Sequence, residues 1–417
     1  MRKWSLIEQG FLSIANFGMA VFLARELSKG EWGSFSLGFA LMLFAQGFQR
    51  ALVSIPVATM AHSAEILSAS LPFWRRTQTK ITAAATAGLG LAALAWRPFG
   101  TDSGMPLALL IAAILVPGFF SLEFWRRVLI QTREIKAAAM VSSFLLFSVA
   151  LLIGTVALRH GGALFAACGM SACTLAAGAL LRRRAMKVLP ATAETISFAG
   201  ELYRFGRWAT LSHVAFSGYN TAIQMVLTMV CGSAAMGSFA AVRNLTQPIN
   251  TLIGAVDNLD KPRAARAFAG GSFPDLFSSL WRTMATLTML GGGYLILCAA
   301  GGGHLVNALY HGRYGYAWNE IWLWCLIASA MMAAQPMESG LYVAQRTDAL
   351  FVNRVISAVI GLGTAVITIP RFGVVGALMG LATGWIATAF LAFLQLQLFA
   401  RKAGATQPAT ALEAVQG

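Results

Sequence analysis

Two arginines interrupt long apolar runs, and they are the residues best placed to bind an anion. Arg50 closes the run Gln46-Gly47-Phe48-Gln49-Arg50, and Arg243 is followed by the polar residues Asn244 and Gln247. An arginine in the middle of a bilayer costs about 2.5–3.5 kcal/mol, so it normally faces a wet cavity or a partner. A guanidinium also binds phosphate through two parallel hydrogen bonds. We therefore expect both arginines to attract an anionic group such as a phosphate, or else to pair with a carboxylate or reach an interface.

Amide side chains lie on neighbouring apolar segments. Asn16, Asn220 and Gln224 share related helical faces in two separate runs. Sugar hydroxyls need such donors and acceptors, whereas amides inside membrane proteins also bond neighbouring helices at about 0.6 kcal/mol each. Both interpretations stay open, and the candidate substrate-binding set is Arg50, Arg243, Asn16, Asn220, Gln224, Asn244 and Gln247.

Carboxylates within the apolar runs are the candidates for coupling to an ion. Glu338 follows Pro336, and Arg346 is the next basic residue along the chain. A buried carboxyl there could carry a proton or bind Na⁺, or form a structural salt bridge. Glu8 is a second coupling candidate, and Glu123 precedes Arg126 by three residues, which favours an intrahelical ion pair.

No motif in the sequence predicts covalent catalysis, a nucleotide site or a metal site. No glycine-rich loop precedes a Lys-Ser/Thr pair. The five cysteines lie in or beside apolar stretches and form no metal-binding or disulfide pattern. We therefore do not expect an enzyme, and we expect no cofactor.

The composition requires a membrane. Of 417 residues, 57% are hydrophobic and 11% are charged. A soluble chain carries about 45–50% apolar and about 25% charged residues, so soluble enzymes, disordered proteins and fibrous repeats are excluded. The net charge of +15 lies in clusters between apolar runs, which favours membrane topology over nucleic-acid binding.

The length and the hydropathy pattern predict an all-α polytopic protein with about twelve transmembrane helices. The first run resembles a secretion signal, but polar residues interrupt it and it continues to Ala24, so we interpret it as a retained span. The expected spans are 6–25, 33–56, 78–97, 105–125, 137–158, 162–181, 205–230, 235–257, 277–300, 317–343, 350–370 and 373–399.

The basic residues assign an orientation to these spans. Lys and Arg are roughly four times as frequent on the side of both termini as on the other side, which places both termini in the cytoplasm by the positive-inside rule. The segment 59–78 is too polar to cross, and its apolar residues predict a helix on the cytoplasmic membrane surface.

The two halves of the chain resemble each other. Gly33-Ser34-Phe35 and Gly237-Ser238-Phe239 each open a span, and the same offset relates Asn16 to Asn220. A duplicated six-helix unit keeps its orientation, so two bundles around a central cavity are expected. The expected division is an N-terminal bundle at 1–182, a basic cytoplasmic linker at 183–199, a C-terminal bundle at 200–402 and a disordered tail at 403–417.

Several short motifs are similar to those of bacterial polysaccharide and O-antigen exporters. The resemblance extends over nearly the whole chain, and the motifs that carry it are short. They are Phe22-Leu23-Ala24-Arg25-Glu26-Leu27 with Glu31-Trp32-Gly33, Tyr203-Arg204-Phe205-Gly206-Arg207-Trp208, Leu309-Tyr310-His311-Gly312-Arg313-Tyr314 and Ile369-Pro370-Arg371-Phe372-Gly373. The resemblance implies the multidrug/oligosaccharidyl-lipid/polysaccharide exporter superfamily, with twelve helices in two bundles.

The resemblance also implies a function, namely translocation of a polyprenyl-diphosphate-linked oligosaccharide across the bacterial inner membrane for O-antigen, capsule or exopolysaccharide synthesis. The implied partners are that glycan, membrane lipids, H⁺ or Na⁺, and a polymerase and glycosyltransferases. The alternatives are a cation-coupled multidrug exporter of the same superfamily and a membrane-embedded glycan polymerase or ligase. The last would need a large extracytoplasmic loop, and the loops predicted on that side are short.

Overall fold

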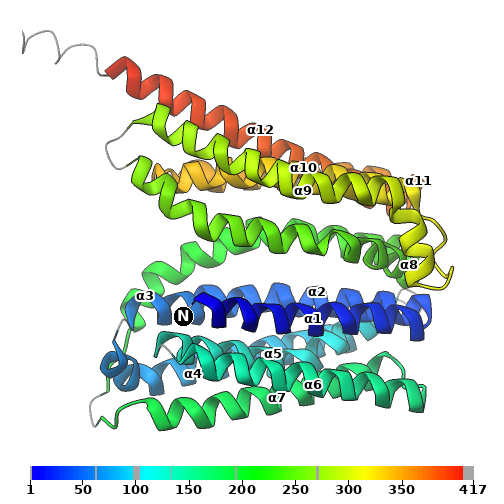
Figure 1. Ribbon diagram of the computed structural model, residues 1–417. Helices are drawn as coiled ribbons and strands as arrows, with labels where there is room; N and C mark the ends of the chain where they lie inside the picture. The colour runs from blue at the N-terminus through cyan, green and yellow to red at the C-terminus, as the bar shows by residue number, and fades with distance from the viewer. Residues whose placement is uncertain are drawn as a thin grey trace, which may run out of the picture. The chain divides into compact units, whose positions relative to one another are not determined.

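A computed structural model describes residues 2–61, 63–96, 104–132, 134–192, 195–268 and 272–406. Within these ranges the chain is helical, and no strand occurs (Figure 1). The elements are α1 (Arg2–Glu26), α2 (Lys29–Gln49), the π-helical turn η1 (Arg50–Ser54), α3 (Ile55–Met60), α4 (Ala64–Trp96), α5 (Met105–Gln131), α6 (Ile135–Arg159), α7 (Ala163–Val188), α8 (Ala199–Ala267), α9 (Phe273–Leu309), α10 (Trp318–Val343), α11 (Thr347–Phe372) and α12 (Val374–Thr406).

These elements agree with the predicted all-α membrane architecture. Eight helical stretches in the described part of the chain are long and apolar enough to cross a membrane. One of them, Ala209–Val256, covers two expected spans, because α8 runs on through Gly232 at a φ of 80°. A glycine reaches this left-handed region without the steric penalty that a side chain adds. Counted across this kink, and with α2, η1 and α3 as one span, the helices correspond to the twelve expected spans.

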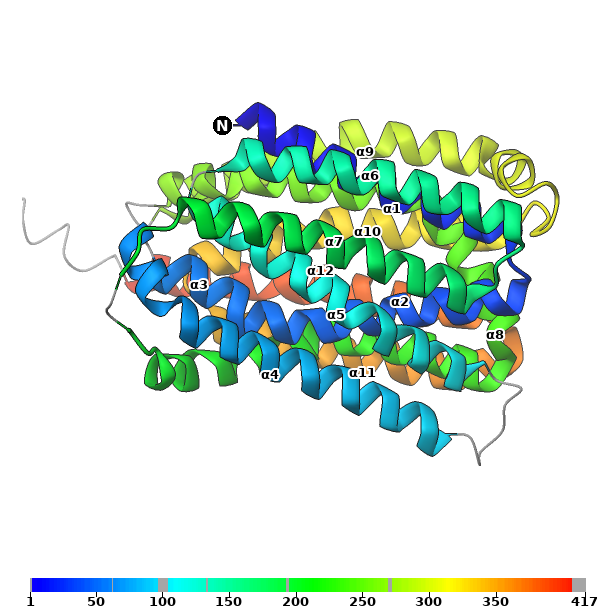
Figure 2. The same ribbon diagram turned by 90° about the horizontal axis from the view of Figure 1, so that it is seen from below.

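The chain divides into two compact units, Met1–Asn244 and Leu245–Gly417. In the first unit α5 packs on α2, α4 and α7, while α1 packs on α6 (Figure 2). In the second unit α12 packs against both α10 and α11. The predicted tail at 403–417 overlaps the end of α12, and its last part lies outside the described residues.

The expectation of a surface helix at 59–78 is wrong for most of that segment. The helix α4 begins at Ala64 and continues without a break to Trp96. Leu67, Leu71 and Trp74 are buried against Phe124 and neighbouring residues instead of facing lipid headgroups. An amphipathic pattern gives the same period whether its apolar face meets a membrane or a protein core, and here the core covers it.

The basic segment after the sixth span is also more helical than expected. The helix α7 continues to Val188 and so includes the three arginines at 182–184. The extended residues that follow are attached to α4, because Ser68 Oγ donates to the Pro190 carbonyl at 2.5 Å and Ile196 N–H donates to the Ala69 carbonyl at 3.0 Å.

The π-helical turn at Arg50 comes directly before Pro56. Pro56 has no N–H, so in a regular α-helix the carbonyl four residues earlier would lose its donor. The chain widens by one residue before the proline, and Ile55 N–H donates to the Arg50 carbonyl five residues back. Such widened turns are frequent at functional sites, and this one begins at an arginine that the sequence singles out.

Candidate functional site

His213 connects α2 to the first part of α8. His213 Nε2 donates to the Phe44 carbonyl at 2.8 Å, and its ring contacts the rings of Phe44 and Phe48. A Cβ on Gly47 would lie 1.8 Å from the His213 ring, so only glycine leaves room for it. The imidazole therefore joins the two helices seven residues before Asn220, one of the candidate binding residues.

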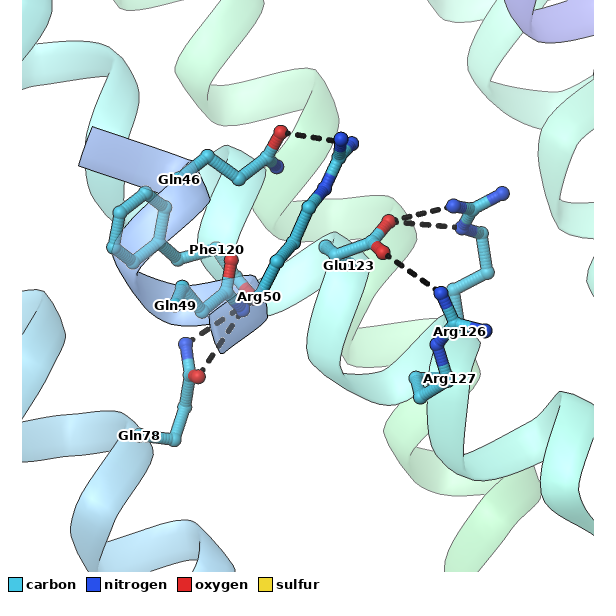
Figure 3. A network of polar contacts seen from close by, with 8 residues as sticks. All are labelled: Gln46, Gln49, Arg50, Gln78, Phe120, Glu123, Arg126 and Arg127. Carbon is cyan, nitrogen blue, oxygen red and sulfur yellow. Dashed lines mark hydrogen bonds and ion pairs between the residues drawn. The ribbon is translucent and has the colours of Figure 1, made fainter. Parts of the chain in front are cut away.

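Arg50 is exposed and is held by a neutral group. Its Nη2 donates to Gln46 Oε1 at 3.3 Å, one turn earlier, as Figure 3 shows. No carboxylate forms an ion pair with Arg50 in the described ranges. The amide orients the guanidinium and leaves its positive charge in place.

A buried amide network fixes the backbone beside Arg50. Gln49 Nε2 donates to Gln78 Oε1 at 3.1 Å and to the Phe120 carbonyl at 2.9 Å, and Gln78 Nε2 reaches the same carbonyl at 3.3 Å (Figure 3). These bonds join the last residue of α2 to α4 and α5. This network was not predicted from the sequence, because Gln49 and Gln78 lie 29 residues apart, on different helices.

The ion pair predicted for Glu123 is confirmed. Its Oε2 accepts from Arg126 Nη2 at 2.6 Å, and its Oε1 lies 3.7 Å from Arg127 Nη2. Figure 3 shows the carboxylate turned toward these two arginines, while Arg50 reaches Gln46. Glu123 therefore belongs to a local charge cluster.

Arg243 and Gln224 come together from the two parts of α8. Arg243 Nη1 donates to Gln224 Oε1 at 3.3 Å, and its guanidinium carbon lies 6.0 Å from the centre of the Phe239 ring. Both of these partners are neutral. Gln224 is buried and also donates to the Asn220 carbonyl at 3.2 Å, so three of the candidate residues form one chain of contacts.

The other candidates lie in different surroundings. Asn244 is buried beside Arg243, whereas Gln247 is exposed and accepts a hydrogen bond from Asn250. Asn16 is exposed on α1, which packs mainly on α6. The side chain of Glu8 lies outside the described part of the chain.

Gly33 and Gly237, which match in the sequence repeat, both lie where α2 crosses the second part of α8. A Cβ on Gly33 would lie 1.7 Å from the Ser233 carbonyl oxygen, and a Cβ on Gly237 would lie 2.3 Å from the Lys29 carbonyl oxygen. Small residues four apart let helix backbones approach this closely in membrane proteins. The two contacts are equivalent under the repeat, because the offset that relates Gly33 to Gly237 also relates Lys29 to Ser233.

In the second unit Glu338 forms a buried ion pair with a neighbouring helix. Arg354 Nε and Nη2 donate to Glu338 Oε1 and Oε2 at 3.0 and 3.1 Å, and both side chains are largely buried. A structural salt bridge was one of the two expectations for Glu338, and its partner Arg354, which was not predicted, lies on α11 and not on α10. The bidentate geometry favours the structural role over ion coupling.

A double-mutant cycle separates the two roles of Glu338. Glu338→Gln leaves Arg354 buried without its carboxylate, which costs about 3–5 kcal/mol, so we expect strong loss of folded protein measured by fluorescence-detected size exclusion. Glu338→Gln with Arg354→Gln should recover most of that loss and retain gradient-dependent transport. A double variant that is folded but no longer responds to a gradient would contradict the structural role.

The long apolar helices indicate a multi-pass membrane protein. The chain is similar over 95% of its length to an inward-facing multidrug resistance MATE family transporter of the MOP superfamily, at a TM-score of 0.75, 12% identity and 96% coverage of that chain. It is also similar to the lipid II flippase MurJ in an inward closed conformation, at a TM-score of 0.68, 12% identity, and coverage of 95% of this chain and 88% of that one.

A third similar structure is a MOP superfamily transporter from Pyrococcus furiosus, at a TM-score of 0.65, 12% identity, and coverage of 95% and 93%. No protein-family model matches the chain, and no curated protein sequence matches it. The three likenesses show the fold, which these transporters share at low identity.

Proposed function

We propose that this protein translocates a polyprenyl-diphosphate-linked oligosaccharide across the bacterial inner membrane, as a flippase in surface polysaccharide synthesis. The observation that carries the proposal is the state of Arg50, an exposed guanidinium in an apolar helix whose hydrogen-bond partner is a neutral amide. A fixed cation of this kind attracts a diphosphate strongly in a low-dielectric surrounding. Arg243, held by Gln224, is the second proposed phosphate ligand.

Amides beside these cations support a glycan as the cargo. Gln224, Asn220 and Asn244 place amide side chains close to Arg243 along the same helix, and Asn16 and Gln247 complete the proposed set. The named function of one similar structure, a lipid II flippase, supports the view that this fold accommodates a lipid-linked cargo.

The proposed mechanism is alternating access between two six-helix bundles, joined by the linker at 183–199 and with both termini cytoplasmic. Substrate binding would select between inward-open and outward-open states that exist before binding. An H⁺ or Na⁺ gradient would bias this equilibrium through a carboxylate such as Glu8, and a polymerase and glycosyltransferases would act before and after translocation.

The second candidate function is cation-coupled export of small molecules, which the named activity of the MATE structures supports. The charge of the candidate residues separates the two functions, because a cationic drug would be repelled by Arg50 whereas a diphosphate would be attracted. In the Pyrococcus furiosus transporter, reverse polarity of the binding pocket likewise suggests a different function.

A reconstituted assay tests the choice. We expect purified protein in liposomes to move a fluorescent polyprenyl-diphosphate oligosaccharide between leaflets, measured by its exposure to a membrane-impermeant quencher, at least tenfold faster than empty liposomes. Ethidium efflux under a proton or sodium gradient should stay at the level of empty liposomes. Ethidium transport without glycan translocation would replace the proposal with drug export.

A further inference from the structure

The helix α4 has one face inside the protein and one face outside it. Leu67, Leu71 and Trp74 are buried in the core formed with α5 and α7. The opposite face stays exposed along almost the whole helix, with cations at one end and apolar residues, including Leu91 and Leu94, at the other.

The cationic end of that face carries a shallow pocket of about 540 Å³. Its lining consists of one helical stripe, namely Pro72, Arg75, Arg76, Thr79, Lys80 and Ala83. The stripe is about 17 Å long at 1.5 Å per residue. The stripe carries three positive charges. Its position is fixed because the opposite face of α4 is packed in the protein core.

These three cations differ from those arginines of the first unit that pair with a carboxylate. Arg126 and Arg127 pair with Glu123, and Arg184 pairs with Glu134. In the described ranges no carboxylate pairs with Arg75, Arg76 or Lys80. Their charge therefore remains available for a ligand.

The apolar continuation of the stripe favours a lipid over a soluble anion. Beyond Ala83 the exposed face consists of alanine, glycine and leucine, and the side chains of Leu91 and Leu94 are 66% and 59% exposed. A phosphate held at Lys80 would leave an acyl chain free to lie along these residues. The lining has no amide and no aromatic ring, so it offers little to a glycan.

We propose that the exposed face of α4 is a binding site for an anionic phospholipid. The phosphate contacts Arg75, Arg76 and Lys80, and an acyl chain lies along Ala83–Leu94. Charge complementarity and continuity between the cationic and apolar parts of one helix face carry the proposal. It does not depend on the substrate proposed above, because the site is a lipid contact and takes no part in translocation.

Native mass spectrometry of the full-length protein in detergent tests the site. We expect phosphatidylglycerol to bind at least tenfold more tightly than phosphatidylcholine, since each cation near a membrane surface adds substantial affinity for anionic lipid. The variant Arg75→Gln/Arg76→Gln/Lys80→Gln should lose that preference. The variant Arg182→Gln/Arg183→Gln/Arg184→Gln removes the same charge from α7 and should keep it.

Two outcomes of this comparison would overturn the site. Equal losses in both variants would show bulk electrostatic attraction, and no loss in the α4 variant would exclude these cations. Because the α4 variant keeps every buried residue of α4, its thermal stability in detergent should be unchanged, and an unstable α4 variant would be replaced by the three single substitutions.

Competition identifies the source of the phosphate. Millimolar inorganic pyrophosphate should not displace phosphatidylglycerol, and Leu91→Asn/Leu94→Asn should weaken its binding several-fold, because both results require the acyl contact. Displacement by pyrophosphate would show a soluble-anion site. Displacement by a polyprenyl diphosphate at lower concentration than phosphatidylglycerol would show a cargo site, and either result would overturn the proposal.

Discussion

A disulfide between Gly30→Cys and Ser233→Cys is expected to abolish transport when oxidised. A Cβ on Gly30 would lie 3.2 Å from Ser233 Oγ, and about 3 Å separates the Cβ of one cysteine from the sulfur of the other in a disulfide. The bond would join α2 to the second part of α8 beside the Gly33–Gly237 crossing. If alternating access separates these helices, oxidation should lower glycan translocation more than tenfold and dithiothreitol should restore it.

The single substitutions supply the controls for the cross-link. Gly30→Cys and Ser233→Cys alone should translocate at the parental rate under both redox conditions. Cys231 lies two residues from Ser233, so all variants carry Cys231→Ser to prevent a competing bond. Full activity of the oxidised double variant, with the disulfide verified by mass spectrometry, would show that the crossing stays closed during transport.

Arg243→Ala is expected to lower translocation of the lipid-linked glycan by about 10- to 100-fold. A hydrogen bond to a charged group contributes about 1.5–3 kcal/mol, which corresponds to that range. Arg243→Lys keeps the charge and loses the planar fork, so it should give an intermediate rate. Arg50→Ala should lower the translocation rate by a similar factor, because the neutral amide of Gln46 does not neutralise the Arg50 guanidinium and its charge can act on the ligand.

Arg263→Ala is the matched control on the same helix. Arg263 is exposed and pairs with Asp260 at 2.8 Å, so its removal should change the rate less than twofold. Membrane abundance, measured by quantitative immunoblot, should be equal in all variants. Normal translocation by Arg243→Ala at equal abundance would remove Arg243 from the site.

The helices could be predicted from the sequence because their signal is strong. Long apolar runs bounded by charges gave spans whose positions agree with the described helices, and the partners of Glu123 lie on its own helix, within one turn. The start of α4 could not be predicted in the same way. Leu67, Leu71 and Trp74 give one amphipathic period, and whether a core or a headgroup region covers that face is decided by packing with α5.

The pairings between helices were the part of the candidate site that sequence reasoning missed. Glu338 meets Arg354 on the next helix, and Gln49 meets Gln78 across two helices. Spacing along one helix identifies neighbours three or four residues apart, whereas these contacts depend on how helices rotate about their axes. The need for a glycine at position 47 likewise becomes visible only when the position of the His213 ring is known, because a Cβ there would overlap that ring.

The reciprocal contact at Gly33 and Gly237 has a consequence for the origin of the chain. Gly33 meets Ser233 as Gly237 meets Lys29, which is the isologous pattern of a two-fold homodimer. A single six-helix ancestor that paired with a copy of itself would have used one surface twice at this crossing. Gene fusion would then have preserved the interface while each copy diverged, as the different residues at Lys29 and Ser233 illustrate.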